Sequence, residues 1–182
     1  MSRVLVTGMS GTGKSSALAE LGRRGHRVVD TDDPGWREYR GYEDPSDQLR
    51  QGEWLWKEER MTLLLDSDDG RSLSVGGCVR NQSTFYDRFD AVVLLSAPAD
   101  VILDRIERRT TNPYGKSPVE RAMILDDLAT IEPLLRESCT HELDASRPLV
   151  EIVADLDAIS RGLDRGTSTA LRRRPRSHRS LP

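Results

Sequence analysis

Short apolar runs alternate along the chain with longer segments of helical spacing, a pattern typical of a parallel sheet covered by helices. The run at 91–95 is apolar throughout, as expected for a central strand that is buried on both faces. The other predicted strands are 3–7, 27–30, 72–78 and 141–143. We therefore expect a three-layer α/β fold with about five parallel strands in the order 2-3-1-4-5 and helices on both faces.

The helical pattern is clearest where apolar residues recur every three or four positions. It predicts helices at 16–21, 53–66, 99–109, 118–137 and 149–163. At 182 residues, the chain fits one domain, which we place at 1–163.

The first strand leads into Gly8-Met9-Ser10-Gly11-Thr12-Gly13-Lys14-Ser15, a phosphate-binding loop. Its small residues let backbone N–H groups point inward, and the following helix offers its positive N-terminal dipole to the same anion. Lys14 would reach the outer phosphates of ATP, and the Ser15 hydroxyl would bind Mg²⁺. The predicted nucleotide-binding residues are Gly8, Ser10, Gly11, Thr12, Gly13, Lys14, Ser15 and Ser16.

An acidic cluster, Asp30-Thr31-Asp32-Asp33, ends the second strand. In an open parallel sheet, ligands bind beyond the carboxyl ends of the strands, so these carboxylates should face the same crevice as the phosphate loop. Asp30 is the candidate metal ligand, and Asp32 or Asp33 would hold or deprotonate a substrate hydroxyl. Alternatively, Asp32 or Asp33 caps a turn before Pro34.

Residues 34–52 are polar and rich in turn formers, which predicts a long excursion rather than a packed element. Its aromatic residues Trp36, Tyr39 and Tyr42 either stack on a substrate ring or anchor the loop to the body.

The third strand is interrupted at Gly76-Gly77, where bare backbone would let a ligand approach closely. Arg80, Asn81 and Gln82 follow directly. Arg80 and Gln82 are candidates for hydrogen bonds to a substrate, although Asn81-Gln82 could equally start a helix that leads to Arg88.

Three arginines, Arg105, Arg108 and Arg109, end the helix at 99–109 and precede a segment punctuated by Pro113 and Gly115. Such a segment can close over a nucleotide, neutralise a transferring phosphoryl group and exclude water, so we predict a lid at about 108–118. The alternative is that the arginines only pair with the helix dipole.

The net charge of −3 conceals an asymmetry between the body and the end of the chain. From residue 164 onward, six arginines stand against one aspartate, so residues 164–182 carry +5 and the rest carries −8. We expect a disordered basic tail, and the acidic body argues against a specific nucleic-acid surface.

No apolar run reaches the roughly 18 to 20 residues that span a bilayer, and no leader pattern is visible. Cys78 and Cys139 are far apart, without metal-site spacing. We expect a cytoplasmic protein without membrane contact, as a monomer or weak dimer.

Over about residues 3–160, the chain resembles the small-molecule and nucleoside monophosphate kinases of the phosphate-loop class, most closely the shikimate kinase-like group. The resemblance rests on the phosphate loop, Asp30-Thr31-Asp32, Gly52-Glu53, Gly76-Gly77 and the arginine-bearing lid, in that order. It implies that the first aspartate serves Mg²⁺ and the second serves the substrate hydroxyl.

Three positions depart from the shikimate kinase pattern. Lys57 stands where that group has an arginine, the lid lacks Arg-Pro-Leu-Leu, and Thr130-Ile131 replaces the arginine before Glu132-Pro133-Leu134-Leu135. Lys57 remains a candidate substrate-binding residue, but lysine cannot make the same two-pronged carboxylate contact. The resemblance thus predicts the fold and the reaction class rather than the acceptor.

Taken together, these patterns predict an ATP- and Mg²⁺-dependent kinase that transfers the γ-phosphoryl group to a small metabolite or nucleotide. Lys14, Asp32, Arg105, Arg108 and Arg109 are the predicted catalytic residues. The alternative is an ATP-binding regulatory module, or slow ATPase, that acts through a protein or polyanion partner.

Overall fold

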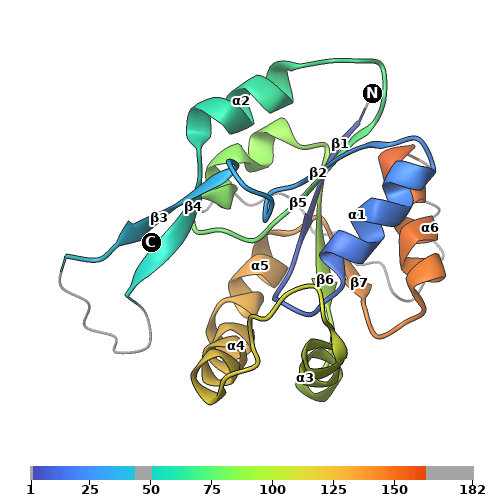
Figure 1. Ribbon diagram of the computed structural model, residues 1–182. Helices are drawn as coiled ribbons and strands as arrows, with labels where there is room; N and C mark the ends of the chain where they lie inside the picture. Colours follow the sequence, from blue (N-terminus) through green and yellow to red (C-terminus); the bar gives the residue numbers. More distant parts are fainter. Residues whose placement is uncertain (1, 44–50, 163–182) are drawn as a thin grey trace.

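In the computed structural model, residues 2–43 and 51–162 are described, and their main element is a five-stranded parallel sheet (Figure 1). The strand order is β2-β5-β1-β6-β7, which confirms the predicted order 2-3-1-4-5. The strands are β1 (Arg3–Thr7), β2 (Arg27–Asp30), β5 (Leu73–Gly76), β6 (Ala91–Ser96) and β7 (His141–Asp144). The predicted basic tail at 164–182 lies outside the described residues.

Strand β1 shows how the sheet divides the core into two layers. Val4 and Val6 point to one face, where they pack with α1 (Lys14–Arg23) and α6 (Leu149–Ser160). Leu5 points to the other face, toward α2 (Glu58–Asp66), the 3₁₀ helix η1 (Gln82–Arg88) and α5 (Glu132–Ser138). The alternation follows from the two-residue period of a strand, and it buries β1 on both sides.

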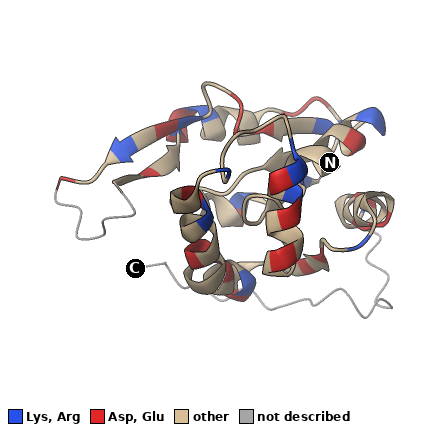
Figure 2. Cartoon of the chain, turned by 60° about the horizontal axis from the view of Figure 1, so that its bottom comes forward, with Lys and Arg blue, Asp and Glu red and all other residues tan. Residues whose placement is uncertain are grey.

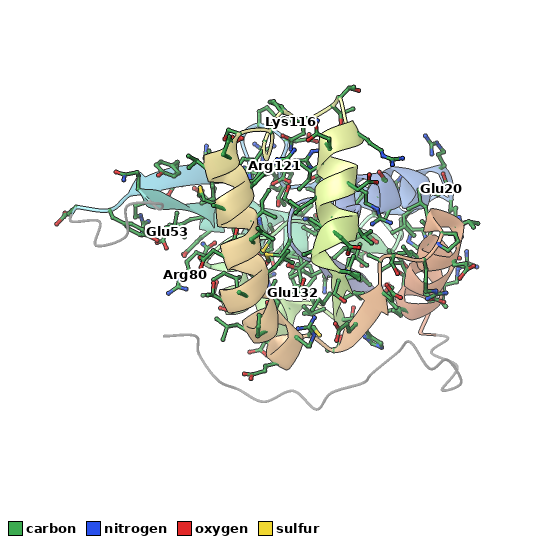
Figure 3. All side chains as sticks on the ribbon, turned by 90° about the horizontal axis from the view of Figure 1, so that it is seen from below. Glu20, Glu53, Arg80, Lys116, Arg121 and Glu132 are labelled. Carbon is green, nitrogen blue, oxygen red and sulfur yellow. The ribbon has the colours of Figure 1, made fainter. Side chains whose placement is uncertain are left out.

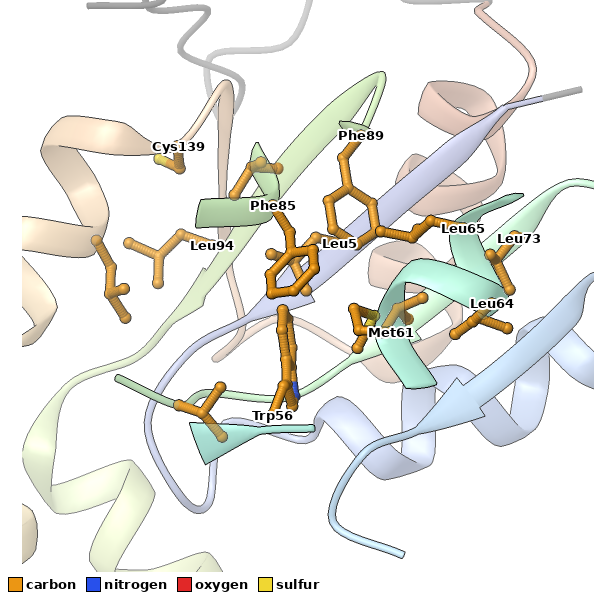
Figure 4. Close-up of a cluster of buried hydrophobic side chains, with 14 of the residues drawn as sticks. Leu5, Trp56, Met61, Leu64, Leu65, Leu73, Phe85, Phe89, Leu94 and Cys139 are labelled. Atoms are coloured by element: carbon orange, nitrogen blue, oxygen red, sulfur yellow. The ribbon is translucent and has the colours of Figure 1, made fainter. Parts of the chain in front are cut away.

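The core on the second face is the larger of the two layers (Figure 4). Trp56 and Phe85 meet edge to face with ring centroids 5.8 Å apart, and Met61 and Leu65 of α2 are fully buried in the same cluster. Each fully buried large apolar side chain contributes roughly 1.5–3 kcal/mol, so this layer fixes the positions of the segments above it.

The prediction for residues 34–52 was wrong where the structure describes them. Residues Arg37–Gly41 form β3 and Gly52–Trp56 form β4, which pair antiparallel as a hairpin apart from the main sheet (Figure 1). The helix predicted from Glu53 therefore begins only at Glu58, and Gly52-Glu53 lies on a strand instead of opening a helix. Tyr39, Trp54 and Trp56 favour extended backbone, but the polar residues around Tyr39 led to the prediction of a loop.

The helix predicted at 118–137 is divided into α4 (Pro118–Thr130) and α5. Ile131 caps one helix and precedes the other, and Pro133 cannot donate a backbone N–H to a continuous ladder. Helix α6 ends at Ser160, whereas residue 163 was predicted. Strand β5, predicted at 72–78, spans Leu73–Gly76. The open alternative at Asn81-Gln82 is confirmed, because η1 begins at Gln82.

Helix α3 (Ala99–Arg108) and α4 stand together beyond the carboxyl ends of the strands, and residues 109–117 connect them. Ile102 and Ile106 of α3 pack on Ile124 of α4. Gly115 has φ +90°, and a Cβ there would lie 2.7 Å from Ile106, so the connection is packed closely against both helices. Among the described residues, no helix is both long and apolar enough to cross a membrane.

Candidate phosphate-binding site

The phosphate loop occupies the turn from β1 into α1 (Figure 1). Gly8, Gly11 and Gly13 have φ values of +143°, +89° and +95°, which only glycine adopts readily. A Cβ at Gly8 would lie 2.3 Å from the Leu95 carbonyl oxygen, so this glycine also allows a close approach to β6. The loop thus has the backbone that a phosphate cradle requires.

Lys14 begins α1 and folds back across the loop. Its Nζ donates to the carbonyl oxygens of Gly8 at 2.7 Å and Met9 at 3.1 Å. The hydroxyl of Thr12 donates to the same Met9 carbonyl at 2.9 Å, which fixes the loop from within. The ammonium group is therefore held at the loop, where it can meet a bound phosphate.

The residues available for a metal ion are Ser15 and Asp30. Ser15, like Ser16, is exposed in the first turn of α1, and Asp30 is the last residue of β2. One hydroxyl and one carboxylate fit Mg²⁺, which takes few protein ligands and completes its shell with water and substrate phosphates. In the described part of the chain, no group of three or more acidic, histidine or cysteine side chains could hold a metal ion.

Asp32 is the carboxylate that connects separate parts of the site. Arg37 of β3 donates to its Oδ1 at 2.7 Å, and the Asp32 side chain remains 42% exposed. The backbone N–H of Asp32 donates to Asp30 at 3.0 Å, while Asp33 is exposed in the following turn. Both Asp30 and Asp32 thus have fixed orientations, and Asp32 keeps a face open to solvent.

The lid arginines differ in what they reach. Arg109 donates to the hydroxyl of Ser10 at 3.2 Å and to the Tyr114 carbonyl, so it lies on the phosphate loop. Burial lowers the pKa of Arg109, and the Asp32 carboxylate opposes that shift. Arg109 therefore joins the predicted lid segment to the phosphate loop.

The other cations of this region point elsewhere. Arg105 donates to the Ala145 carbonyl at 2.8 Å, near the end of β7. Arg108 pairs with Asp104 at 2.9 Å, and its side chain is 79% exposed. Lys116 donates to the Glu107 carbonyl and Arg121 pairs with the Glu107 side chain, at the lid end of α4 (Figure 3). Of the three arginines predicted for the lid, only Arg109 has a hydrogen bond to the phosphate loop in the described residues.

Gly76 and Gly77 are used for packing. A Cβ at Gly76 would lie 2.3 Å from Leu18 of α1, and one at Gly77 would lie 2.1 Å from the Thr31 hydroxyl. The following Cys78 is half-buried near Thr7 and Lys14, and burial raises the pKa of its thiol. These glycines therefore bring β5 close to its neighbours.

The remaining predicted substrate residues divide into buried and exposed. Gln82 is buried, where it accepts from the Thr7 hydroxyl at 3.2 Å and donates to Tyr86 at 3.0 Å. Arg80 lies 3.7 Å from Glu53 of the hairpin (Figure 3), and Lys57 is exposed at the start of α2. Both the oxygen and the nitrogen of the Gln82 amide are therefore hydrogen-bonded to protein groups.

Sequence reasoning missed Arg37, because its segment was interpreted as a loop. Residues 37–41, Arg-Glu-Tyr-Arg-Gly, contain no alternation of apolar and polar residues that would have indicated the strand.

Figure 2 views the molecule with the α3–α4 end forward, and acidic residues mark several of the elements seen there. In the described hairpin and its neighbours, each of three arginines has a carboxylate within 4.0 Å: Arg37 has Asp32, Arg40 has Glu38 and Arg80 has Glu53.

Known proteins are similar to this chain in sequence and in fold. Shikimate kinase 2 of Yersinia enterocolitica is 27% identical over 175 residues, which cover 84% of this chain and 92% of that protein. Among solved structures, the shikimate kinase of Acinetobacter baumannii in complex with shikimate has a TM-score of 0.58 at 16% identity, and the alignment covers 90% of this chain and 95% of the other. A gluconokinase from Sinorhizobium meliloti has a TM-score of 0.58 at 22% identity over 89% and 95% of the two chains.

These structures share the fold of this chain, and their low sequence identities leave the acceptor open. Residues 4–126 match the family model described as an AAA domain, which covers more than half of the sequence. The chain therefore belongs to this AAA domain family of P-loop proteins.

Proposed function

We propose that this protein is a kinase that transfers the γ-phosphoryl group of ATP to a hydroxyl group of a small metabolite. The observation that carries the proposal is the hydrogen bond from Arg109 to Ser10 of the phosphate loop. Phosphoryl transfer depends on positioning and on neutralising charge, and this contact brings a cation to the phosphate cradle, while Asp32 follows β2 at the same edge of the sheet. The likeness to shikimate kinase 2 supports the same reaction class.

In the proposed reaction, the loop amides and Lys14 hold the phosphates of ATP. Ser15 and Asp30 would hold Mg²⁺, which when bound neutralises phosphate charge. Asp32 accepts the proton of the acceptor hydroxyl as that oxygen bonds to the γ-phosphorus. The bond from this phosphorus to the bridging oxygen of ADP breaks, and Arg109 stabilises the charge that spreads over the transferred group.

Arg37 has a supporting part in this scheme. By donating to one oxygen of Asp32, it orients the carboxylate and leaves the second oxygen for the acceptor. The lid between α3 and α4 would exclude water, so that the acceptor hydroxyl rather than water receives the phosphoryl group.

The test is ADP production by the purified protein with ATP and Mg²⁺, alone and with separate pools of nucleosides, nucleoside monophosphates, sugar acids, shikimate and a metabolite extract. Stimulation by at least one pool is expected. Tight ATP binding with no stimulation in any pool would overturn the proposal and favour an ATP-binding regulatory module. Truncation after residue 163 separates the two functions independently, because a kinase should keep its stimulated turnover without the basic tail, whereas a module that acts through the tail should lose its partner.

A further inference from the structure

The β3–β4 hairpin carries an aromatic surface beside Asp32. Tyr39 and Trp54 are directly paired across the two strands, and their ring centroids are 5.3 Å apart in an edge-to-face arrangement. Tyr39 is 51% exposed and Trp54 is 45% exposed, so both rings keep open area in contact with solvent. Two large half-exposed aromatic rings on one face offer a stacking surface for a planar ligand.

A single side chain connects this surface to the candidate base. The guanidinium of Arg37 lies over the Trp54 ring, with its central carbon 4.5 Å from the ring centroid. The same guanidinium donates to Asp32 at 2.7 Å. The Arg37 guanidinium therefore contacts both the Asp32 carboxylate and the indole, which places the two groups near enough for one ring-bearing molecule with a hydroxyl to reach both.

The hairpin is also held in place at its base. The backbone N–H of Trp56 donates to the side-chain oxygen of Asn81 at 2.8 Å, and the Asn81 amide returns a bond to the Trp56 carbonyl at 3.1 Å. The backbone N–H of Arg80 donates to the carbonyl of Trp54 itself at 3.1 Å. The aromatic surface is thus fixed to the segment that follows β5, which favours its use as a preformed site.

The charges around the surface indicate what kind of ring-bearing molecule fits. Arg37, Arg40 and Arg80 each have a carboxylate within 4.0 Å. Across residues 30–43 and 51–60, eight carboxylates stand against four cations, among them Lys57 and Arg60, so the described hairpin region presents no surplus of positive charge. Of these carboxylates, Asp30 and Asp33 place negative charge at the end of β2. A neutral acceptor is accordingly favoured over one that carries a carboxylate or phosphate.

We propose that the acceptor is a neutral, hydroxyl-bearing aromatic compound of the nucleoside class, whose base stacks on Trp54 and Tyr39 while its hydroxyl meets Asp32. This inference rests on the proposed kinase function and names its substrate class. The transferred phosphoryl group forms a bond to the nucleoside oxygen, the hydroxyl proton passes to Asp32, and ADP leaves.

The test compares nucleosides, nucleoside monophosphates and sugar acids as separate acceptors in the ADP assay. Nucleosides should stimulate ADP formation, and the corresponding monophosphates should stimulate it at least ten-fold less. Stimulation by sugar acids or monophosphates but not by nucleosides would overturn this inference and leave the kinase function intact. Failure of every acceptor would instead overturn the kinase function.

The hairpin variants test the stacking surface itself. Trp54→Leu should raise the KM for the nucleoside about ten-fold or more and leave the KM for ATP within two-fold, because an aromatic ring stacks on a base and leucine does not. Trp54→Phe should restore most of the affinity. Leu63→Ala, which alters a 64% exposed apolar side chain on α2, is the matched control.

A binding measurement keeps the inference testable without turnover. Saturation-transfer NMR with the nucleoside alone should show contact between the base protons and the wild-type protein, and this contact should weaken in Trp54→Leu. Equal nucleoside binding by wild type and Trp54→Leu would overturn the proposed site.

Discussion

The indole N–H of Trp56 donates to the hydroxyl of Thr31 at 2.9 Å, and this buried bond joins the β3–β4 hairpin to the end of β2. Thr31 in turn donates to the Gly76 carbonyl at 2.8 Å. The hydroxyl is thus both donor and acceptor, and three segments that surround the candidate site meet at one side chain.

Replacement of Trp56 tests this junction. Trp56→Phe keeps most of the apolar volume but removes the donor, and we expect a loss of about 1–3 kcal/mol in the free energy of unfolding by urea. Trp56→Ala also leaves a cavity and should cost about 3–5 kcal/mol. Leu63→Ala should change stability by less than about 0.5 kcal/mol, and equal losses for Trp56→Phe and Leu63→Ala would contradict the role of the bond.

Gly8 and Gly70 form a matched pair for the phosphate loop. Both have positive φ, but a Cβ at Gly8 would meet the Leu95 carbonyl at 2.3 Å, whereas a Cβ at Gly70 meets nothing within 4 Å. Gly70→Ala should cost about 1–2 kcal/mol of backbone strain and leave ATP binding intact. Gly8→Ala should cost more, because the loop must move away from β6.

Calorimetric titration with ATP and urea unfolding measure the two effects. Gly8→Ala should weaken ATP binding at least ten-fold, in keeping with a displaced phosphate cradle. Nearly equal ATP affinity for the two variants would show that the loop backbone does not need its present shape.

Tyr86 provides a test that depends on pH. Burial raises its pKa from 10.0 to about 12, against the opposing hydrogen bonds from neighbouring groups. A raised pKa means that the folded state favours the neutral phenol, so its contribution to stability is complete below pH 10 and is lost as the pH rises through about 12.

Absorbance titration of the tyrosines should therefore show one late component among the four in the sequence. Tyr86→Phe should remove that component. The absence of a late component in the wild type, with native circular dichroism, would contradict the burial of Tyr86.

Arg109 and Arg108 separate a lid residue that reaches the site from one that does not. Arg109 contacts Ser10, whereas Arg108 pairs with Asp104 in solvent. Arg109→Ala should lower kcat by about 10³-fold, as expected for loss of a cation that stabilises the transferring group. Arg108→Ala should lower kcat by less than ten-fold, since its partner is a surface carboxylate.

The two variants should be compared at saturating ATP, so that differences in nucleotide affinity do not enter kcat. A larger loss for Arg108→Ala than for Arg109→Ala would reverse the assignment of the lid residue.

The parallel sheet could be predicted from the sequence because apolar runs such as 91–95 indicate burial on both faces. Strand β1 could be recognised because the phosphate-loop motif directly follows it. The hairpin could not be predicted, because Tyr39 and Trp54 lie on two half-exposed strands. These strands are stabilised by pairing with each other and by the contact of Arg37 with Trp54. Such contacts join residues that are distant in sequence, and the local pattern contains only one side of each pair.

The candidate site shows the same division. The phosphate loop has a fixed spacing, so its residues could be named in advance. The lid remains a prediction. Which arginine of this segment contacts Ser10 depends on how α3 packs through Ile102 and Ile106, and only Arg109, not Arg108, makes that contact in the described residues. Gly76 and Gly77 were predicted to admit a ligand, but the groups that approach them are Leu18 and Thr31 of the chain itself.

The most direct test of the central claim is to identify the product of ATP turnover by phosphorus NMR in the presence of an acceptor that stimulates ADP formation. The account predicts one phosphorylated acceptor for each ADP formed, and loss of both signals by about 10³-fold in Lys14→Ala. Formation of ADP with only inorganic phosphate, or an undiminished rate in Lys14→Ala, would contradict the assignment of this site as a kinase.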